Sequence, residues 1–225
     1  MKVGALAIGQ SPRLDVEPDF LAAACPGVEL LQRGALDGVS PEELTGLMPR
    51  PGEYLLVTRL RDGTEVKLAE ERIVERMRGC VYDLESEGVE LIALFCTGEF
   101  PGLESRVPLL KPDRLIAKFM TAVSPGAAIC AIVPSAAQIP TIKAKWEKEG
   151  FKVEAIALSP YTCTEVELRG AARKAAESRG SIIVLDCIGY SRRMKAVFRE
   201  VCRRPVILPR TLLGRAVAEF ADSLL

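Results

Sequence analysis

The stretch LIALFCTGEF, residues 91–100, decides the fold class of this chain. Its first five residues are all apolar, so a strand formed by them has no polar face to turn toward water. Such strands are typical of parallel sheets that helices cover on both sides. A second stretch, IIVLDCIGY at residues 182–190, repeats the pattern of an apolar strand that runs into a cysteine. Both stretches therefore predict buried, mainly parallel sheet.

Outward from these two stretches, short apolar runs alternate with longer amphipathic segments. The expected strands are residues 3–8, 28–31, 54–58, 91–95, 127–133, 153–158, 182–185 and 206–208. The expected helices are residues 13–24, 41–48, 69–87, 112–122, 136–149, 165–178, 192–202 and 211–224. This alternation predicts an α/β fold with mainly parallel sheets flanked by helices. A hairpin around the Asp62-Gly63 turn is also expected.

The chain contains two similar halves, which predict two pseudo-symmetric α/β lobes with a cleft between them. ALAIGQSPR (5–13) and CAIVPSAAQ (130–138) each read as a strand that runs into a polar turn. The Lys111-Pro112 pair marks the boundary, because proline ends an extended segment and can begin a helix. The first lobe is expected to comprise residues 1–111 and 210–225, and the second residues 112–209.

Composition excludes several classes of protein. The 225 residues carry 30 Lys+Arg against 30 Asp+Glu and only 5% aromatic residues, so a nucleic-acid binder is not expected. The absence of histidine rules out Ser-His-Asp triads and His-ligated metals. No apolar run is long enough to span a membrane. The seven cysteines include no C-x-x-C pair, and this favours free thiols. Free thiols are typical of a reducing cytosol, so a soluble cytoplasmic protein is expected. A homodimer is one assembly that the sequence leaves open.

The candidate binding residues follow the strands, because ligands of open α/β sheets collect beyond the carboxyl ends of the strands. Gln10, Ser11 and Arg13 follow the first strand, where Ser11 suits a helix N-cap and Arg13 suits a bidentate pair with a carboxylate. A capped helix and an anion site are both open readings of this turn. The other candidates are Thr97, Gly98, Pro134, Ser135, Gly189, Tyr190 and Ser191.

Cys96 and Cys187 are the candidate catalytic residues. A buried cysteine is usually an inert apolar residue, but two at equivalent strand ends of related halves are expected to converge on one cleft. A helix N-terminus behind each would favour the thiolate. One thiolate can remove the proton α to a carboxylate, and the other thiol can return a proton on the opposite face. This chemistry needs no metal, nucleotide or pyridoxal cofactor.

The two cysteines are expected to have different roles. Asp186 precedes Cys187, and a carboxylate close to a thiol raises the pKa of that thiol. Cys96 has no adjoining acid, and Thr97 beside it can hydrogen-bond a substrate. Cys96 is therefore expected to be the base, and Cys187 the opposing acid or a nucleophile.

Together these motifs resemble the AroM family over nearly the whole chain. The resemblance rests on ALAIGQSPR, the hairpin, LFCTGEFPG (94–102), IVPSAAQ (132–138) and VLDCIGYSRRM (184–194). That family is similar to the aspartate/glutamate racemase superfamily, which implies two pseudo-symmetric lobes with a cysteine from each. The superfamily includes cofactor-independent racemases, isomerases and decarboxylases. The resemblance thus implies a racemase, isomerase or lyase that acts on a small carboxylate through Cys96 and Cys187.

Some residues depart from the racemase pattern. Gln10-Ser11 stands where amino-acid racemases typically have Asp-Ser, and Ile188-Gly189 stands where they have Thr-Glu or Thr-His. None of the replacing side chains exchanges a proton as a carboxyl or imidazole group does. The alternative function is therefore a non-catalytic protein that binds a small carboxylate in the same cleft.

A basic cluster follows the second cysteine. Seven Lys and Arg residues lie between Arg192 and Arg210, and Glu200 is the only acid among them. Charge runs of this kind are usually solvated helix faces. The functional interpretation is attraction of an anionic substrate or of its phosphate group.

Overall fold

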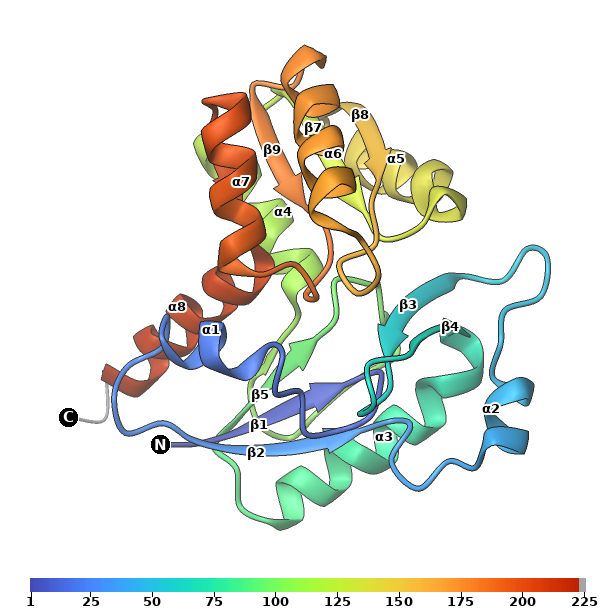
Figure 1. Cartoon of the computed structure of the whole chain (residues 1–225). Helices are drawn as coiled ribbons and strands as arrows, with labels where there is room; N and C mark the ends of the chain where they lie inside the picture. The colour runs from blue at the N-terminus through green and yellow to red at the C-terminus, as the bar shows by residue number, and fades with distance from the viewer. Residues whose placement is uncertain (223–225) are drawn as a thin grey trace.

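Two parallel sheets organise the chain in the computed structural model, which describes residues 1–222 (Figure 1). In the first sheet, β1 (Lys2–Ala7) lies between β2 (Glu29–Gly34) and β5 (Leu91–Phe95), and β6 (Leu109–Leu110) forms the edge beyond β5. In the second, β7 (Ala128–Val133) lies between β8 (Lys152–Ala157) and β9 (Ile182–Leu185), and β10 (Val206–Ile207) forms the edge beyond β9. The strand order is the same in both sheets. The expected α/β fold with two pseudo-symmetric lobes is confirmed.

Helices cover both faces of each sheet. The helices before Lys111 are α1 (Glu17–Leu21), α2 (Pro41–Gly46) and α3 (Glu70–Ser86). After it come α4 (Pro112–Val123), the short turn η1 (Ala136–Gln138), α5 (Ile139–Lys148), α6 (Glu165–Glu177), α7 (Arg192–Cys202) and α8 (Pro209–Asp222). α8 packs against α1 and α4, so this helix returns toward the first sheet (Figure 1). None of these described helices has the length and apolar character needed to cross a membrane.

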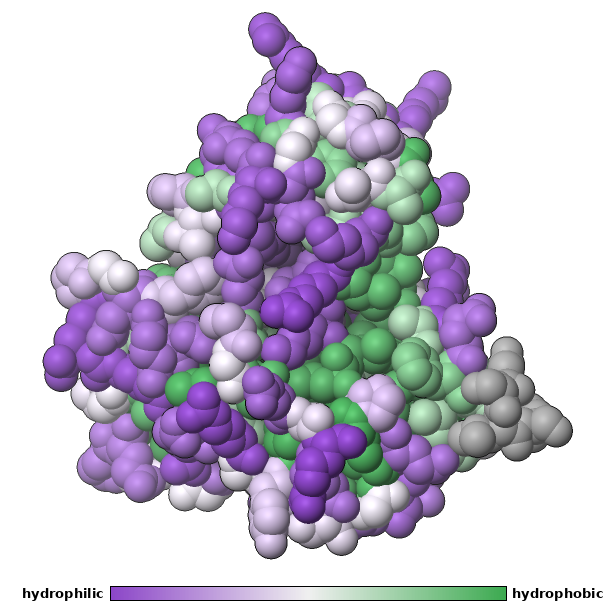
Figure 2. Space-filling model, turned by 180° about the vertical axis from the view of Figure 1, so that it is seen from behind, coloured by the Kyte–Doolittle hydropathy of each residue, from purple (hydrophilic) through white to green (hydrophobic). Residues whose placement is uncertain are grey.

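The core lies on both sides of each sheet because the inner strands β1, β5, β7 and β9 are buried along nearly their whole length. Along β1, Val3 and Ala5 pack on the side of α1 and α8, whereas Leu6 packs under α3. α3 contributes buried side chains at helical spacing: Ile73, Met77, Val81 and Leu84. Seen from behind, hydrophilic side chains cover much of the surface, and apolar surface gathers where the lobes meet (Figure 2).

The first helix is shorter than its expected span of residues 13–24. α1 begins at Glu17 with Pro18 in its first turn, and Val16 rather than Ser11 is its N-cap. Proline has no N–H to donate, so a helix can start at Pro18 but cannot run through it unbroken. The expectation that Ser11 caps this helix is therefore wrong. The expected end of the last helix, Leu224, lies outside the described residues.

The expected hairpin is present and bridges toward the second lobe. β3 (Leu55–Arg59) and β4 (Glu65–Ala69) pair antiparallel around Gly63, whose φ of +97° favours glycine. The side-chain amide of Gln138 donates a hydrogen bond to the Leu55 carbonyl at 3.1 Å. The hairpin thus contacts both halves of the molecule.

Parallel pairing brings the candidate strand ends together. Ala7 pairs with Phe95, and Ile132 pairs with Leu185, so in each sheet the loops after these strands leave from the same side, the carboxyl end of the sheet. The carboxyl ends of the two sheets are in contact: the Thr97 hydroxyl after β5 donates a hydrogen bond to the Asp186 carbonyl after β9 at 3.2 Å.

The packing of Gly34 generates a prediction about the loop after β1. A Cβ at Gly34 would collide with the Gly9 carbonyl oxygen and would lie 2.7 Å from the Ser11 nitrogen, whereas nothing lies within 4 Å of a Cβ at Gly79. We expect Gly34→Ala to lower the free energy of unfolding by about 3 kcal/mol. Gly79→Ala, inside α3, is the control and should raise it by about 0.5–1 kcal/mol. Urea denaturation measures both, and equal effects would contradict the close approach.

Candidate active site

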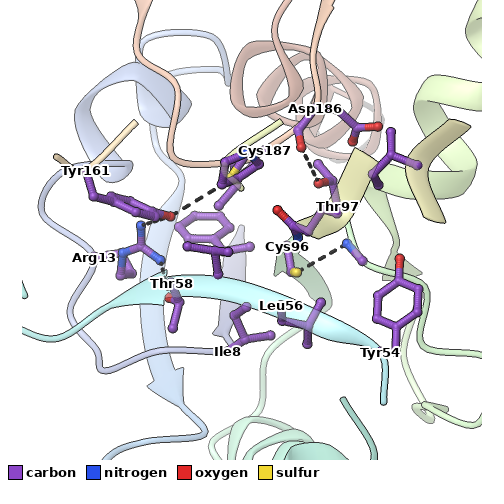
Figure 3. Close-up of a pocket in the computed structure, with 17 residues that line it drawn as sticks. Ile8, Arg13, Tyr54, Leu56, Thr58, Cys96, Thr97, Tyr161, Asp186 and Cys187 are labelled. Atoms are coloured by element: carbon purple, nitrogen blue, oxygen red, sulfur yellow. Dashed lines mark hydrogen bonds between the residues drawn. The ribbon is translucent and has the colours of Figure 1, made fainter. Parts of the chain in front are cut away.

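The carboxyl ends of the two sheets enclose a small pocket (Figure 3). Its volume is about 20 Å³, which is room for about one water molecule. The lining combines sulfur, hydroxyl and apolar groups: Ile8, Arg13, Tyr54, Leu56, Val57, Thr58, Phe95, Cys96, Thr97, Gly98, Pro134, Gln138, Ile142, Tyr161, Asp186, Cys187 and Ile188. Any organic ligand exceeds this volume, so the pocket must widen before one enters.

Cys96 and Cys187 line this pocket from different sheets. Cys96 directly follows β5, and Cys187 lies two residues beyond the end of β9. The Cys96 sulfur accepts a hydrogen bond from the Gly98 N–H at 3.2 Å, and the Cys187 sulfur accepts one from the Gly189 N–H at 3.4 Å. Only 7% of Cys96 and 6% of Cys187 is exposed. The two thiols thus have matching backbone surroundings.

Neither thiol lies at a helix N-terminus, so that expected source of thiolate stabilisation is wrong. The loop after Cys96 leads into β6, and α7 begins only at Arg192, with Ser191 as its N-cap. The effect of a helix dipole fades beyond the first turn. Burial instead raises the pKa of Cys96 to about 12 and also raises that of Cys187. Both thiols therefore keep their protons at neutral pH.

Arg13 and Tyr161 distinguish the two thiols. The Tyr161 hydroxyl lies 3.8 Å from the Cys187 sulfur and accepts a hydrogen bond from Arg13 Nη2 at 3.3 Å (Figure 3). Burial raises the pKa of Cys187, and the Gly189 N–H, the Tyr161 hydroxyl and the Arg13 charge all oppose this rise. The neighbouring Asp186 carboxylate adds only a lesser upward effect on that pKa. The Tyr161 hydroxyl and the Arg13 charge thus lie beside Cys187, whereas the Gly98 N–H and the Lys145 charge oppose the rise in the pKa of Cys96.

Arg13 is not free to clamp a substrate carboxylate. Its Nε and Nη2 atoms each donate a hydrogen bond to the Asp15 carboxylate at 2.8 Å. Nη1 faces the Thr58 hydroxyl at 3.4 Å, and the whole side chain is buried. The expected bidentate pair with a substrate is therefore already made with Asp15. Arg13 instead places positive charge beside Tyr161, with its guanidinium 5.7 Å from the ring centre.

Asp186 joins the Cys187 loop to α5. One carboxylate oxygen accepts hydrogen bonds from Lys145 Nζ and Trp146 Nε1, both at 2.8 Å. Its other oxygen is buried and has no hydrogen-bond partner among the described residues. The Asp186 carbonyl also accepts the hydrogen bond from Thr97. Asp186 thereby fastens both cysteine loops to one helix.

Of the candidates after β1, Arg13 lines the pocket, whereas Gln10 and Ser11 do not. The Ser11 hydroxyl and N–H both bond the Asp37 carboxylate, at 2.5 and 2.9 Å. The Gln10 side-chain oxygen accepts a hydrogen bond from the Arg61 N–H at 2.9 Å. Gln10 and Ser11 therefore hold the loops around the first sheet together.

The remaining candidates divide between the lining and its support. Thr97, Gly98 and Pro134 line the pocket, whereas Ser135, Gly189, Tyr190 and Ser191 do not. The buried Tyr190 hydroxyl donates a hydrogen bond to the Leu158 carbonyl, and Ser191 caps α7.

Gly189 has a steric role next to Cys187. A Cβ at Gly189 would lie 2.6 Å from the Tyr161 hydroxyl oxygen. A larger residue here would push the phenol away from the Cys187 sulfur. Glycine at this position thus permits the contact that distinguishes Cys187 from Cys96.

Several lining residues lie on segments that the sequence analysis did not connect to the cleft. Tyr54 and Thr58 come from the hairpin, Gln138 and Ile142 from η1 and α5, and Tyr161 from the loop after β8. The Asp62-Gly63 turn signalled the hairpin, but no local pattern indicates where a hairpin docks. Among residues 1–222, no three His, Cys, Asp or Glu side chains are grouped to hold a metal ion.

Comparisons with known proteins agree with this geometry at the level of fold. A family model described as "AroM protein" matches residues 3–221. No curated protein sequence matches the chain.

Three solved structures are similar to this chain. Allantoin racemase from Klebsiella pneumoniae has a TM-score of 0.65 at 17% identity, covering 100% of this chain and 89% of the other. Glutamate racemase from Aquifex pyrophilus has a TM-score of 0.60 at 17% identity, and the match covers 98% of this chain and 84% of the other. The maleate isomerase Iso from Pseudomonas putida S16 has a TM-score of 0.63 at 13% identity, and the match covers 99% of this chain and 93% of the other. At these identities the likeness establishes the fold.

The contact between Tyr161 and Cys187 generates a first prediction at this site. Tyr161→Phe removes the hydroxyl that favours the thiolate, so the pKa of Cys187 should rise. Alkylation of Cys187 by iodoacetamide should then slow by about threefold to tenfold near pH 8. Mass spectrometry after brief labelling measures this rate for each cysteine. Tyr82→Phe, at an exposed position of α3, is the control, and an unchanged Cys187 rate in Tyr161→Phe would contradict the assignment.

The raised pKa of Cys96 generates a second prediction. The unfolded thiol loses its proton above its ordinary pKa of 9.0, whereas the folded thiol keeps it up to about 12. Cys96 therefore contributes stability that is full below about pH 9 and is lost as the pH rises toward about 12. Between these values, the free energy of unfolding should fall more steeply for the wild type than for Cys96→Ala. The difference in slope should reach at most about 1.4 kcal/mol per pH unit.

Urea denaturation at a series of pH values tests this prediction. Cys25→Ala, which removes a partly exposed thiol instead, is the comparison variant. Parallel curves for the wild type and Cys96→Ala would show that the folded thiol titrates like an unfolded one.

Proposed function

The chain belongs to the AroM family and has the fold of racemases and isomerases, and on this basis we propose that it is a cofactor-independent racemase, isomerase or lyase acting on a small carboxylate. The observation that carries the proposal is one pocket lined by a thiol from each sheet. Two thiols on opposite sides of one carbon can exchange protons with both of its faces.

Cys187 is the proposed base in this reaction. The Arg13 charge and the Tyr161 hydroxyl favour its thiolate, and Gly189 leaves space for the phenol. Cys96 is the proposed acid, because a pKa of about 12 keeps its proton in place at neutral pH. The two roles thus follow from the different surroundings of two otherwise equivalent residues.

The proposed reaction begins when the Cys187 thiol, which is protonated in the ligand-free protein, releases its proton to solvent. The Cys187 thiolate forms an S–H bond with the α-proton of the substrate, and the C–H electron pair moves into the carboxylate to give an enediolate. The Cys96 thiol then gives its proton to the opposite face of the same carbon and is left as a thiolate. Exchange of protons with water restores the starting state of both residues.

The enediolate needs hydrogen-bond donors, and hydroxyl groups supply them. The Thr58 and Tyr161 hydroxyls line the pocket and accept from Arg13, so each keeps its proton to donate, whereas Thr97 donates its proton to the Asp186 carbonyl. In a pocket closed to water, such donors stabilise developing charge more strongly than water does. The substrate carboxylate is proposed to lie against these hydroxyl groups, since Asp15 already occupies the fork of Arg13.

A non-catalytic carboxylate-binding protein is the second candidate. It is favoured by the raised pKa values of both thiols, which leave no thiolate at neutral pH in the ligand-free protein. Ile188 also offers no group to activate Cys187. Under this proposal, ligand binding stabilises the fold without any proton exchange.

Solvent deuterium exchange decides between the two candidates. We expect a panel of small carboxylic acids, incubated with the protein in D₂O, to include one that gains deuterium at its α-carbon. Cys187→Ser and Cys96→Ser should each lower the rate by about 10²–10⁴-fold. Cys25→Ser should leave it unchanged, because Cys25 lies outside the pocket. Nuclear magnetic resonance and mass spectrometry both read the exchange.

A thermal-shift screen with the same acids completes the test. An acid that stabilises the protein without gaining deuterium would support the non-catalytic candidate. Exchange that survives in both serine variants would exclude the two thiols as the proton carriers.

A further inference from the structure

A hollow between α7, α8 and the residues that follow α1 is lined by positively charged side chains. Its volume is about 350 Å³, and Arg192, Lys195 and Arg199 of α7 line it together with Arg215 of α8. Small side chains, including Ala196, leave it open. No Asp or Glu among residues 1–222 lines this basic hollow. It is separate from the thiol pocket and shares no lining residue with it.

The cations of α7 are arranged so that they repel one another. Arg192, Lys195 and Arg199 recur at intervals of three and four residues, which places them on one face of the helix. None of these three forms an ion pair with a described residue, whereas Arg193 on another face pairs with Glu165 at 2.8 Å. One cation of α7 is therefore paired with a carboxylate of α6, whereas the three cations of α7 in the hollow are unpaired among the described residues.

Lys195 shows that these charges converge. It is half-buried, and burial lowers its pKa, as do the nearby charges of Arg215, Arg199 and Arg192. Mutual repulsion of this kind destabilises the folded protein unless an anion relieves it. The arrangement therefore suits a ligand with more than one negative charge.

We propose that the basic hollow binds a small molecule that carries a phosphate or diphosphate group. Guanidinium groups match phosphate oxygens in two-point hydrogen bonds, and a lysine adds a point charge. The volume lies within the range of about 300–1,000 Å³ that is common for small-molecule sites. Among the described residues, none that lines the hollow is aromatic, so the lining offers no ring on which a nucleic-acid base could stack.

The basic hollow lies close to the loop of Cys187. The Arg192 N–H donates a hydrogen bond to the Asp19 carboxylate at 2.8 Å, and the same oxygen pairs with Arg210 at 3.1 Å. Arg210 Nε donates to the carbonyl of Ile188, directly after Cys187, at 3.0 Å. A ligand here would therefore be separated from the thiol loop by a short chain of hydrogen bonds. The proposal that a ligand binds in this hollow does not depend on the function proposed above.

Titration with inorganic pyrophosphate at constant ionic strength tests the proposal. We expect isothermal titration calorimetry on the full chain to show saturable binding of one pyrophosphate, tighter than that of inorganic phosphate. Lys195→Ala and Arg199→Ala should each weaken it at least about tenfold. Arg193→Ala removes the same charge from another face of α7 and should change the affinity by less than about twofold.

Three outcomes would overturn the proposal. The first is the absence of saturable binding by the wild type, and the second is an equal loss in Arg193→Ala, which would show a diffuse charge effect. The third is tighter binding of a short single-stranded oligonucleotide than of pyrophosphate, which would indicate a nucleic-acid surface. Because Arg199 is exposed, Arg199→Ala should fold normally even if Lys195→Ala does not, and circular dichroism checks both.

Discussion

A parallel strand that is apolar on both faces must be covered by helices on both sides, and the rest of this structure depends on that constraint. Each covering helix returns the chain to the start of the next strand, so all strands of a sheet end on the same side, and we call this carboxyl end the edge that carries the loops. β1 and β5 deliver Arg13 and Cys96 to one edge, and β9 delivers Cys187 to the other. When the two edges meet, their loops form a site that neither sheet could form alone.

Buried charges hold that site together. Arg13 and Arg210 are almost wholly buried, and both are tied to the segment that carries Asp15 and Asp19. Arg210 also donates hydrogen bonds to the carbonyls of Asp15 and Ile188, at 2.6 and 3.0 Å, so it joins α8 to both lobes. Removing one partner of such a network leaves a buried charge unmatched, which is strongly unfavourable. The loop of Cys187 is therefore held by charge as well as by packing.

The two halves have the same topology but different chemistry. Each cysteine accepts a hydrogen bond from the N–H of the glycine two residues later, which is the symmetric part of the site. Only Cys187 has the Tyr161 hydroxyl and the Arg13 charge beside it, and they come from opposite lobes. The two thiols therefore share their backbone contacts and differ in the side chains beside them.

The amino-acid sequence was enough to predict the fold class, the repeated halves and the two strand-end cysteines, because these depend on local patterns of apolar residues. It also indicated the hairpin through Asp62-Gly63. Two predictions from the sequence were wrong: the first helix is shorter than residues 13–24, and neither thiol lies at a helix N-terminus. Tertiary structure alone decided that Asp15 occupies the fork of Arg13, that Tyr161 reaches Cys187, and that burial raises both thiol pKa values. Those properties arise between residues far apart in the chain, and a pKa depends on desolvation and neighbouring charges that exist only once the two edges have met.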